Sequence, residues 1–357
     1  MILRRPAGRA GSRTWLFPQR WLRHRPEITI IPGGRIFCRH MALFLTLFQR
    51  LRNNPDFEWA VLSGYGLSGA QALLQIVLVP LYLQTIGKGN FGVLMVVLAA
   101  VNVSQLGVRW LTDRALRAFG EELGAQDKRR LAPLWRTYTL LLLGYGVAVA
   151  VGFALVGYLM PSLLFGNLAP DDLARAGETL ALGGLYSLVL NQQSLCSILL
   201  WASRRVARAN MILVLSIVVF VLLVVPWLLT GGDVRGVPVC LLIGNVVAYL
   251  VSLAVFARKE LGLKSRGSRV PVSDALGTSP GAYIVNSALL VLLQSDTLIV
   301  SIIAGPNVAA DFVLVWKVAE IILLLIWRIA ESSQPQIIAM DIAGETDRIQ
   351  RIRKEGL

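Results

Sequence analysis

Residues 89–108 read GNFGVLMVVLAAVNVSQLGV, a stretch without a single charged side chain. A helix needs about 20 mainly apolar residues to cross a bilayer, so this stretch predicts a transmembrane helix. Five more stretches are also long enough and free of charge: 59–87, 137–170, 179–203, 209–232 and 236–257. Two further apolar stretches carry charges, namely 275–303 and 312–338. The sequence therefore predicts an all-α, polytopic transmembrane helix bundle of about eight helices.

The composition also favours a membrane protein over a soluble one. Of the 357 residues, 55% are hydrophobic and only 16% are charged, whereas soluble domains carry about 25% charged residues. The net charge is +14, but Lys and Arg stand in short loops between apolar stretches. That pattern indicates membrane topology rather than nucleic-acid binding. The cysteines (Cys38, Cys196 and Cys240) and the histidines (His24 and His40) show no ligand spacing, so we expect no metal site and no cofactor.

The loop charges predict the orientation of the chain. Lys and Arg are frequent in the segments 114–136, 204–208 and 258–269, but the alternate loops carry only Lys88, Arg175 and Arg235. By the positive-inside rule, the basic side is cytoplasmic and includes both termini. We expect a multi-pass protein of the bacterial inner membrane. Asp171 and Asp172 fall in a short loop on the opposite side and are expected to form a solvated turn.

Four segments follow from this layout. Residues 1–58 form a basic cytoplasmic N-terminal segment, 59–257 a first six-helix lobe, 258–280 a cytoplasmic linker, and 281–357 the start of a second lobe with two helices and a short tail. Within the first segment, the composition changes at Met41, from a stretch rich in Arg and Pro to a more apolar one. Residues 1–40 either precede the true translation start or form a basic tail on anionic lipid.

Polar side chains recur inside the predicted helices at helical spacing. An ionised group at the bilayer centre costs at least about 2.5–3.5 kcal/mol, so such residues tend to face a cavity or a partner. Taken together they predict a hydrated central cavity. Each also has a structural alternative: ion pairs within a helix, snorkelling to the interface, or hydrogen bonds between helices. The candidate residues are Gln71, Gln75, Asn102, Gln105, Arg109, Asn191, Gln192, Gln193, Asp296, Lys317, Glu320 and Arg328.

Two stretches resemble a known family. Residues 80–119, PLYLQTIGKGNFGVLMVVLAAVNVSQLGVRWLTDRALRAF, are similar to the first hairpin of the polysaccharide transporter family of the multidrug/oligosaccharidyl-lipid/polysaccharide (MOP) flippase superfamily. Residues 296–320, DTLIVSIIAGPNVAADFVLVWKVAE, resemble its seventh and eighth helices, with Asp296 and Lys317 at matching positions. The turns TIGKGNFG and SIIAGPNVAAD occupy equivalent places, as internal repeats do in transporter folds. Where the family often has an acidic residue before Leu106-Gly107, this chain has Gln105.

The resemblance implies two lobes of six helices with the cavity between them and alternating access by rocking of the lobes. Because the family has twelve to fourteen helices and this sequence predicts about eight, we expect either a truncated product, inactive as it stands, or a chain completed by another.

The resemblance implies a flippase rather than an enzyme, with an undecaprenyl-pyrophosphate-linked oligosaccharide as substrate and a role in polysaccharide or lipopolysaccharide biosynthesis. Arg109, Lys317 and Arg328 would attract the pyrophosphate. The amide side chains would line the cavity and hydrogen-bond the sugars, and Asp296 or Glu320 would couple transport to protons or sodium. The expected partners are membrane lipids, this substrate and glycan-assembly membrane proteins.

Three alternatives compete with the flippase. A drug exporter of the same superfamily predicts an acidic cavity, and the excess of basic over acidic groups speaks against it. A membrane-embedded glycan enzyme needs large extracytoplasmic loops or a catalytic carboxylate pair in a soluble domain, and the sequence predicts neither. A non-transporting subunit stays open because the sequence predicts only part of the second lobe.

Overall fold

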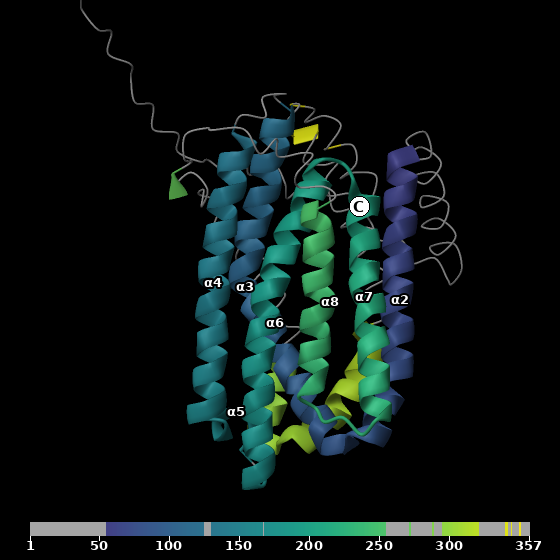
Figure 1. Ribbon diagram of the computed structural model, residues 1–357, viewed down its shortest axis with the longest axis vertical. Coiled ribbons are helices and arrows are strands. Elements are labelled where there is room, and N and C mark those ends of the chain that lie inside the picture. The colour runs from purple at the N-terminus through teal and green to yellow at the C-terminus, as the bar shows by residue number, and fades with distance from the viewer. Residues whose placement is uncertain are drawn as a thin grey trace, which may run out of the picture. The chain divides into compact units, whose positions relative to one another are not determined.

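The computed structural model describes residues 55–124, 130–166, 168–254 and 295–320, with isolated positions 271, 272, 288, 340, 341, 344 and 350. Within these ranges every regular element is helical (Figure 1). The named helices are α2 (Pro55–Thr85), α3 (Gly87–Gly124), α4 (Leu131–Leu159), α5 (Ser162–Phe165), α6 (Pro170–Ala202), α7 (Val206–Leu229) and α8 (Gly236–Ser252). Residues 295–304 and 306–320 are helical as well. Each of the six charge-free stretches coincides with a helix over most of its length, which confirms the predicted all-α bundle.

The surface of these helices is that of a membrane protein. Among the described residues, α2, α3, α4 and α7 are long and apolar enough to cross a membrane, while α8 and Ser295–Ala304 are apolar but shorter. Leu140, Val151 and Leu155 on α4 and Leu222 on α7 are each more than half exposed. Such an apolar outer face is stable against lipid and would be unfavourable in water. The chain is therefore a multi-pass membrane protein.

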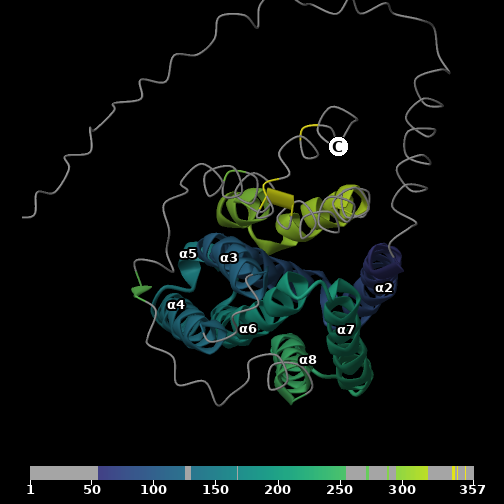
Figure 2. The ribbon, with the colours of Figure 1, turned by 90° about the horizontal axis from the view of Figure 1, so that it is seen from above.

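Helix α6 lies in the middle of the described bundle and packs against α3, α4, α7 and α8 (Figure 2). Glycines allow its close approach to α4. A side chain on Gly157 would overlap the carbonyl of Gly177, and a Cβ on Gly184 would lie 2.9 Å from the Cα of Ala150. Membrane helices associate through such contacts between small residues. The hydrophobic effect does not drive them together, because the surrounding lipid is as apolar as their side chains.

The helices extend beyond the predicted apolar stretches. Arg114 and Arg117 were expected in a loop but lie on α3, where Arg117 Nε donates to Glu121 Oε1 at 3.1 Å. Asp171 and Asp172, expected in a solvated turn, lie in the first turn of α6. These expectations were wrong because hydropathy marks where a helix leaves the bilayer, not where it ends. Ion pairs four residues apart and carboxylates at a helix N-terminus stabilise the exposed turns.

The two similar turns of the sequence reverse the chain in the same way. Gly87 separates α2 from the body of α3 with φ of 79°, and Gly305 separates residues 295–304 from 306–320 with φ of 86°. Glycine adopts this left-handed conformation without the steric cost that other residues meet. Each turn therefore sends the following helix back along the preceding one.

Candidate functional site

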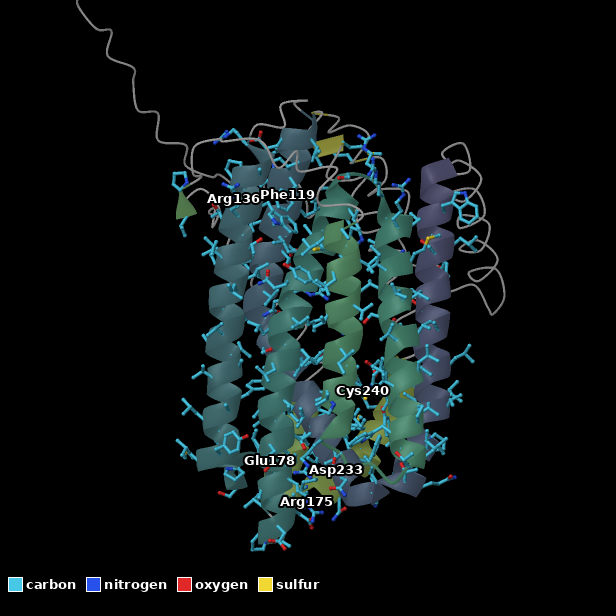
Figure 3. All side chains as sticks on the ribbon, viewed as in Figure 1. Phe119, Arg136, Arg175, Glu178, Asp233 and Cys240 are labelled. Atoms are coloured by element: carbon cyan, nitrogen blue, oxygen red, sulfur yellow. The ribbon has the colours of Figure 1, made fainter. Side chains whose placement is uncertain are left out.

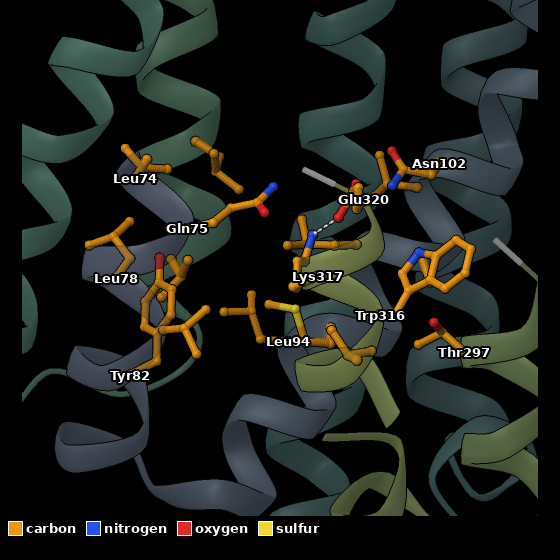
Figure 4. A pocket seen from close by; sticks show the side chains of 18 of the residues that line it. Leu74, Gln75, Leu78, Tyr82, Leu94, Asn102, Thr297, Trp316, Lys317 and Glu320 are labelled. Atoms are coloured by element: carbon orange, nitrogen blue, oxygen red, sulfur yellow. Dashed lines mark hydrogen bonds and ion pairs between the residues drawn. The ribbon is translucent and has the colours of Figure 1, made fainter. Parts of the chain in front are cut away.

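A cavity of about 280 Å³ lies between α2, α3 and the helix 306–320, with further walls from α6, α7 and α8 (Figure 4). Its lining is mostly apolar and aromatic, including Leu78, Tyr82, Met95, Phe220 and Trp316. The cavity is enclosed by helices from both ends of the described chain.

The polar groups of the cavity gather around one ion pair. Lys317 Nζ donates to Glu320 Oε2 at 2.5 Å, and both side chains are about a quarter exposed, at 26% and 27%. Figure 4 shows the amide of Gln75 on the side of the cavity that faces Lys317, with Asn102 and Thr297 across from it. The buried Gln75 Oε1 has no hydrogen-bond partner among the described residues. The cavity thus holds one ion pair and two carboxamide side chains, those of Gln75 and Asn102.

The structure brings together some predicted site residues and separates others. Gln75, Asn102, Lys317 and Glu320 line the cavity. Arg328 lies outside the described residues. The remaining candidates are absent from the lining of this cavity: Gln71, Gln105, Arg109, Asn191, Gln192, Gln193 and Asp296. Sequence reasoning missed the aromatic walls, because Tyr82 and Trp316 carry no signal that separates a cavity wall from a buried core.

Gln105 belongs to a second polar cluster that joins α3, α4 and α6. Its Nε2 donates to Ser187 Oγ at 3.3 Å, and the hydroxyls of Ser187 and Ser104 lie 3.1 Å apart. The hydroxyl of Tyr145 on α4 donates to the carbonyl of Ser104. These bonds link three helices away from the cavity, as expected of hydrogen bonds that hold membrane helices together.

The amide cluster of α6 is buried. Asn191 is fully buried, and neither its Oδ1 nor its Nδ2 has a partner among the described residues. Gln193 Nε2 is likewise buried without a partner, while Gln192 Nε2 reaches the carbonyl of Thr139 at 3.5 Å, a long contact. Buried amides without partners are unfavourable. These three side chains are therefore buried between packed helices and do not line the cavity.

Close contacts join α3 to the helix 306–320 near the two glycine turns. A side chain on Gly92 would overlap the carbonyl oxygen of Pro306, so α3 and the helix 306–320 touch backbone to backbone there. Lys88 Nζ donates to Asp311 Oδ2 at 2.8 Å across the same contact. Ser301 Oγ donates to the carbonyl of Leu164 at 2.9 Å. The first two contacts hold α3 against the helix 306–320, and the third holds the helix 295–304 against α5.

A group of exposed charges lies at one end of the bundle. Figure 3 places Arg175, Glu178 and Asp233 opposite to the end that carries Phe119 and Arg136. Arg235 Nη1 donates to Glu178 Oε2 at 2.7 Å, and its Nε donates to Asp233. The hydrogen bonds to Glu178 and then Asp233 raise the pKa of Arg235 above its ordinary value. Its charge therefore persists at every accessible pH.

No protein-family model and no curated protein sequence matches the chain. Several solved structures do. The MATE multidrug transporter DinF-BH, solved as a complex, has a TM-score of 0.59 at 16% identity, over 80% of this chain and 65% of that one. An outward-facing multidrug resistance MATE family transporter of the MOP superfamily has a TM-score of 0.58 at 15% identity, over 84% and 67%. A MOP superfamily transporter from Pyrococcus furiosus has a TM-score of 0.55 at 15% identity, over 80% and 64%.

The chain spans about two thirds of the length of these structures, between 64% and 67%. At such low identities the likeness establishes the fold alone. The neighbours are transporters. The chain is therefore a multi-pass membrane protein with the fold of MOP superfamily transporters.

Proposed function

We propose that this chain is a flippase that moves a lipid-linked oligosaccharide across the bacterial inner membrane. The observation that carries the proposal is Lys317, a cation inside the cavity of a transporter fold. An ammonium group shielded from bulk water attracts a diphosphate far more strongly than an exposed lysine does. The resemblance of residues 80–119 and 296–320 to the polysaccharide transporter family supports the same substrate class.

The ion pair suggests how binding is coupled to a second ion. Glu320 already accepts a bond from Lys317 at 2.5 Å, so an arriving diphosphate must compete with this carboxylate. A proton or sodium ion on Glu320 would weaken the competition and favour the substrate-bound state. The carboxamide side chains of Gln75 and Asn102, which line the cavity, would hydrogen-bond the polar headgroup. The roles predicted for Arg109, Arg328 and Asp296 stay predictions.

Alternating access would proceed by separation of the turn contacts. The helices α3 and 306–320 are in contact where Lys88 meets Asp311 and Gly92 meets Pro306. Release on that side requires these contacts to part while the opposite end closes. An exposed ion pair of this kind contributes about 0–1 kcal/mol, so the contact can open at modest cost.

A drug exporter is the second candidate, and a specific observation favours it. The cavity walls are mostly apolar and aromatic, as suits an amphipathic compound, and Glu320 could bind a cationic one. The neighbours of known structure include multidrug transporters. For the Pyrococcus furiosus protein, reverse polarity of the binding pocket is said to suggest a different function. Pocket polarity is thus the property that separates the two candidates.

The decisive experiment compares two ligands on the full chain in proteoliposomes. We expect an undecaprenyl-pyrophosphate-linked oligosaccharide to bind, Lys317→Gln to weaken it about tenfold or more, and Glu320→Gln to strengthen it, because one charge-assisted hydrogen bond is gained or lost. Arg136→Gln, an exposed cation outside the cavity, is the control and should bind like the wild type.

The opposite pattern would identify the drug exporter. In that case a lipophilic cationic dye would bind, Glu320→Gln would weaken it, and Lys317→Gln would leave it unchanged or tighter. Lipid-linked oligosaccharide binding that is equal in wild type and Lys317→Gln would contradict the flippase proposal.

A further inference from the structure

A second hollow lies on the outer face of the bundle, between α4 and α6. It has a volume of about 530 Å³ and shares no lining residue with the central cavity. Small side chains line it, namely Ala150 and Ala154 from α4 and Ala181 from α6. At one end stand Tyr158 and Glu178. The hollow is thus an apolar groove with a polar end.

The groove follows from how the two helices meet. Gly157 and Gly177 bring the backbones into contact near the polar end, and Gly184 does the same against Ala150 further along. Between these two contacts α4 and α6 stay close together. The small side chains of Ala154 and Ala181 leave the groove open on the outer surface of this helix pair. Larger side chains at those positions would fill the groove. Its shape is therefore fixed by the same small residues that pack the helices.

The groove opens to lipid. Val151 and Leu185, on its two sides, are 52% and 45% exposed, and the exposed stripe of α4 continues along it. The opposite face of α6 carries Ser187, which bonds to α3. Inside a bilayer, hydrocarbon rather than water fills an apolar groove, because water finds no partners there. An acyl chain is the natural occupant.

The polar end carries charges of both signs. Glu178 accepts from Arg235 at 2.7 Å and is 40% exposed, and a carboxylate has room for a second donor. Arg175, one turn earlier on α6, is 51% exposed and lies 3.7 Å from Asp172. Guanidinium groups bind phosphate, and a carboxylate binds ammonium. This combination complements a zwitterionic headgroup that carries a primary amine.

We propose that the groove between α4 and α6 is a binding site for a phospholipid of the phosphatidylethanolamine type. One acyl chain lies along Ala150, Ala154 and Ala181. The ammonium group donates to Glu178, and the phosphate contacts Arg175. A choline headgroup cannot donate a hydrogen bond to Glu178, so the site discriminates against it. The site is separate from the central cavity and does not depend on the transported substrate.

The test is native mass spectrometry of the purified full chain, titrated with phosphatidylethanolamine and phosphatidylcholine of identical acyl chains. We expect the wild type to retain phosphatidylethanolamine about threefold more than phosphatidylcholine, as one exposed charge pair allows. Ala181→Trp should lower retention of both lipids by filling the groove. Its matched control is Ala148→Trp, at an exposed position of α4 outside the groove, which should behave like the wild type. Glu178→Gln should abolish the preference and keep total retention.

Three outcomes would overturn the proposal. Ala181→Trp could retain lipid as Ala148→Trp does, which would mean that the groove holds none. Glu178→Gln could keep the preference for the amine headgroup. The wild type could also carry no lipid and form a dimer that Ala181→Trp dissociates, which would make the groove an interface between copies. Because Glu178 is exposed, its substitution tests the headgroup contact even where the tryptophan variant does not fold.

Discussion

At the scale of single residues, two polar side chains on one face of α6 make a matched contrast. Ser187 and Asn191 stand one helical turn apart, and both are fully buried. Ser187 shares hydrogen bonds with Ser104 and Gln105, whereas both amide atoms of Asn191 have no partner among the described residues. Burial is the same for the two side chains, so the difference in stability between them should come from their hydrogen bonds.

We therefore expect opposite effects of removing the two polar groups. Ser187→Ala should lower the free energy of unfolding by about 0.6 kcal/mol, the average for a hydrogen bond between membrane helices. Asn191→Leu should leave the free energy of unfolding unchanged or raise it by about 1 kcal/mol. On folding, the wild-type amide of Asn191 loses its hydrogen bonds to water and gains none in return, and leucine avoids this cost. Unfolding in mixed detergent micelles measures both. A larger loss for Asn191→Leu than for Ser187→Ala would show that the amide holds a buried water or another partner.

The contribution of Arg235 to stability should not change with pH near neutrality. Hydrogen bonds to Glu178 and Asp233 raise its pKa. A base whose pKa is raised by folding stabilises the protein at every pH below its unfolded pKa and loses that effect only as the pH rises through the folded pKa. For arginine both values lie far above neutral pH. Arg235→Gln should therefore lower the thermal transition by the same small amount at about pH 6 and about pH 9. A decrease of the transition temperature at only one of these two pH values would contradict this account of Arg235.

At the scale of elements, the contact between α3 and the helix 306–320 depends on the absence of a side chain at Gly92. A methyl group there would overlap the carbonyl oxygen of Pro306. We expect Gly92→Ala to push the two helices apart and to favour the state that is open at this end. Gly144→Ala is the control, because a Cβ on that helical glycine meets nothing within 4 Å.

The measurement is cross-linking of Lys88→Cys with Asp311→Cys by a short bifunctional maleimide, in a chain that also carries Cys38→Ser. The wild-type Lys88 and Asp311 lie in an ion pair of 2.8 Å, so the pair should cross-link readily. Gly92→Ala should lower the yield by about threefold or more, as a small shift in a two-state equilibrium does. Equal yields in the two glycine variants would show that the contact absorbs the methyl group.

The helices themselves could be predicted from the sequence, and their ends could not. The bilayer requires about 20 apolar residues, so each of the six charge-free stretches marked a helix. Beyond the bilayer the rule no longer holds. The charged residues from Arg109 to Glu122 continue α3, and Asp171 and Asp172 begin α6, because charged residues also form stable helices in water.

At the scale of the whole molecule, the sequence indicated a cavity but only part of its lining. Spacing placed Asn102 and Gln105 on one stripe of α3, yet Asn102 lines the cavity while Gln105 bonds to Ser187. Three residues along a helix turn a side chain by about 60° from the starting direction, which is enough to face a different neighbour. Which helix lies there depends on long-range packing, and a single sequence carries no direct signal of it.

The two ends of the bundle should face opposite sides of the membrane. Figure 3 places Arg136 and Asp233 at opposite ends of the bundle, and the loop charges predict that the end with Arg136 faces the cytoplasm. A cysteine introduced at one of these positions at a time reports the orientation in intact cells treated with a membrane-impermeant maleimide. The chain carries Cys38→Ser, and its remaining Cys196 and Cys240 are buried. Asp233→Cys should be labelled at once, and Arg136→Cys only after permeabilisation. The reverse order of labelling would show that the end with Asp233 faces the cytoplasm. The contact of Lys88 with Asp311 would then lie toward the cytoplasm, and export would begin by opening it rather than end there.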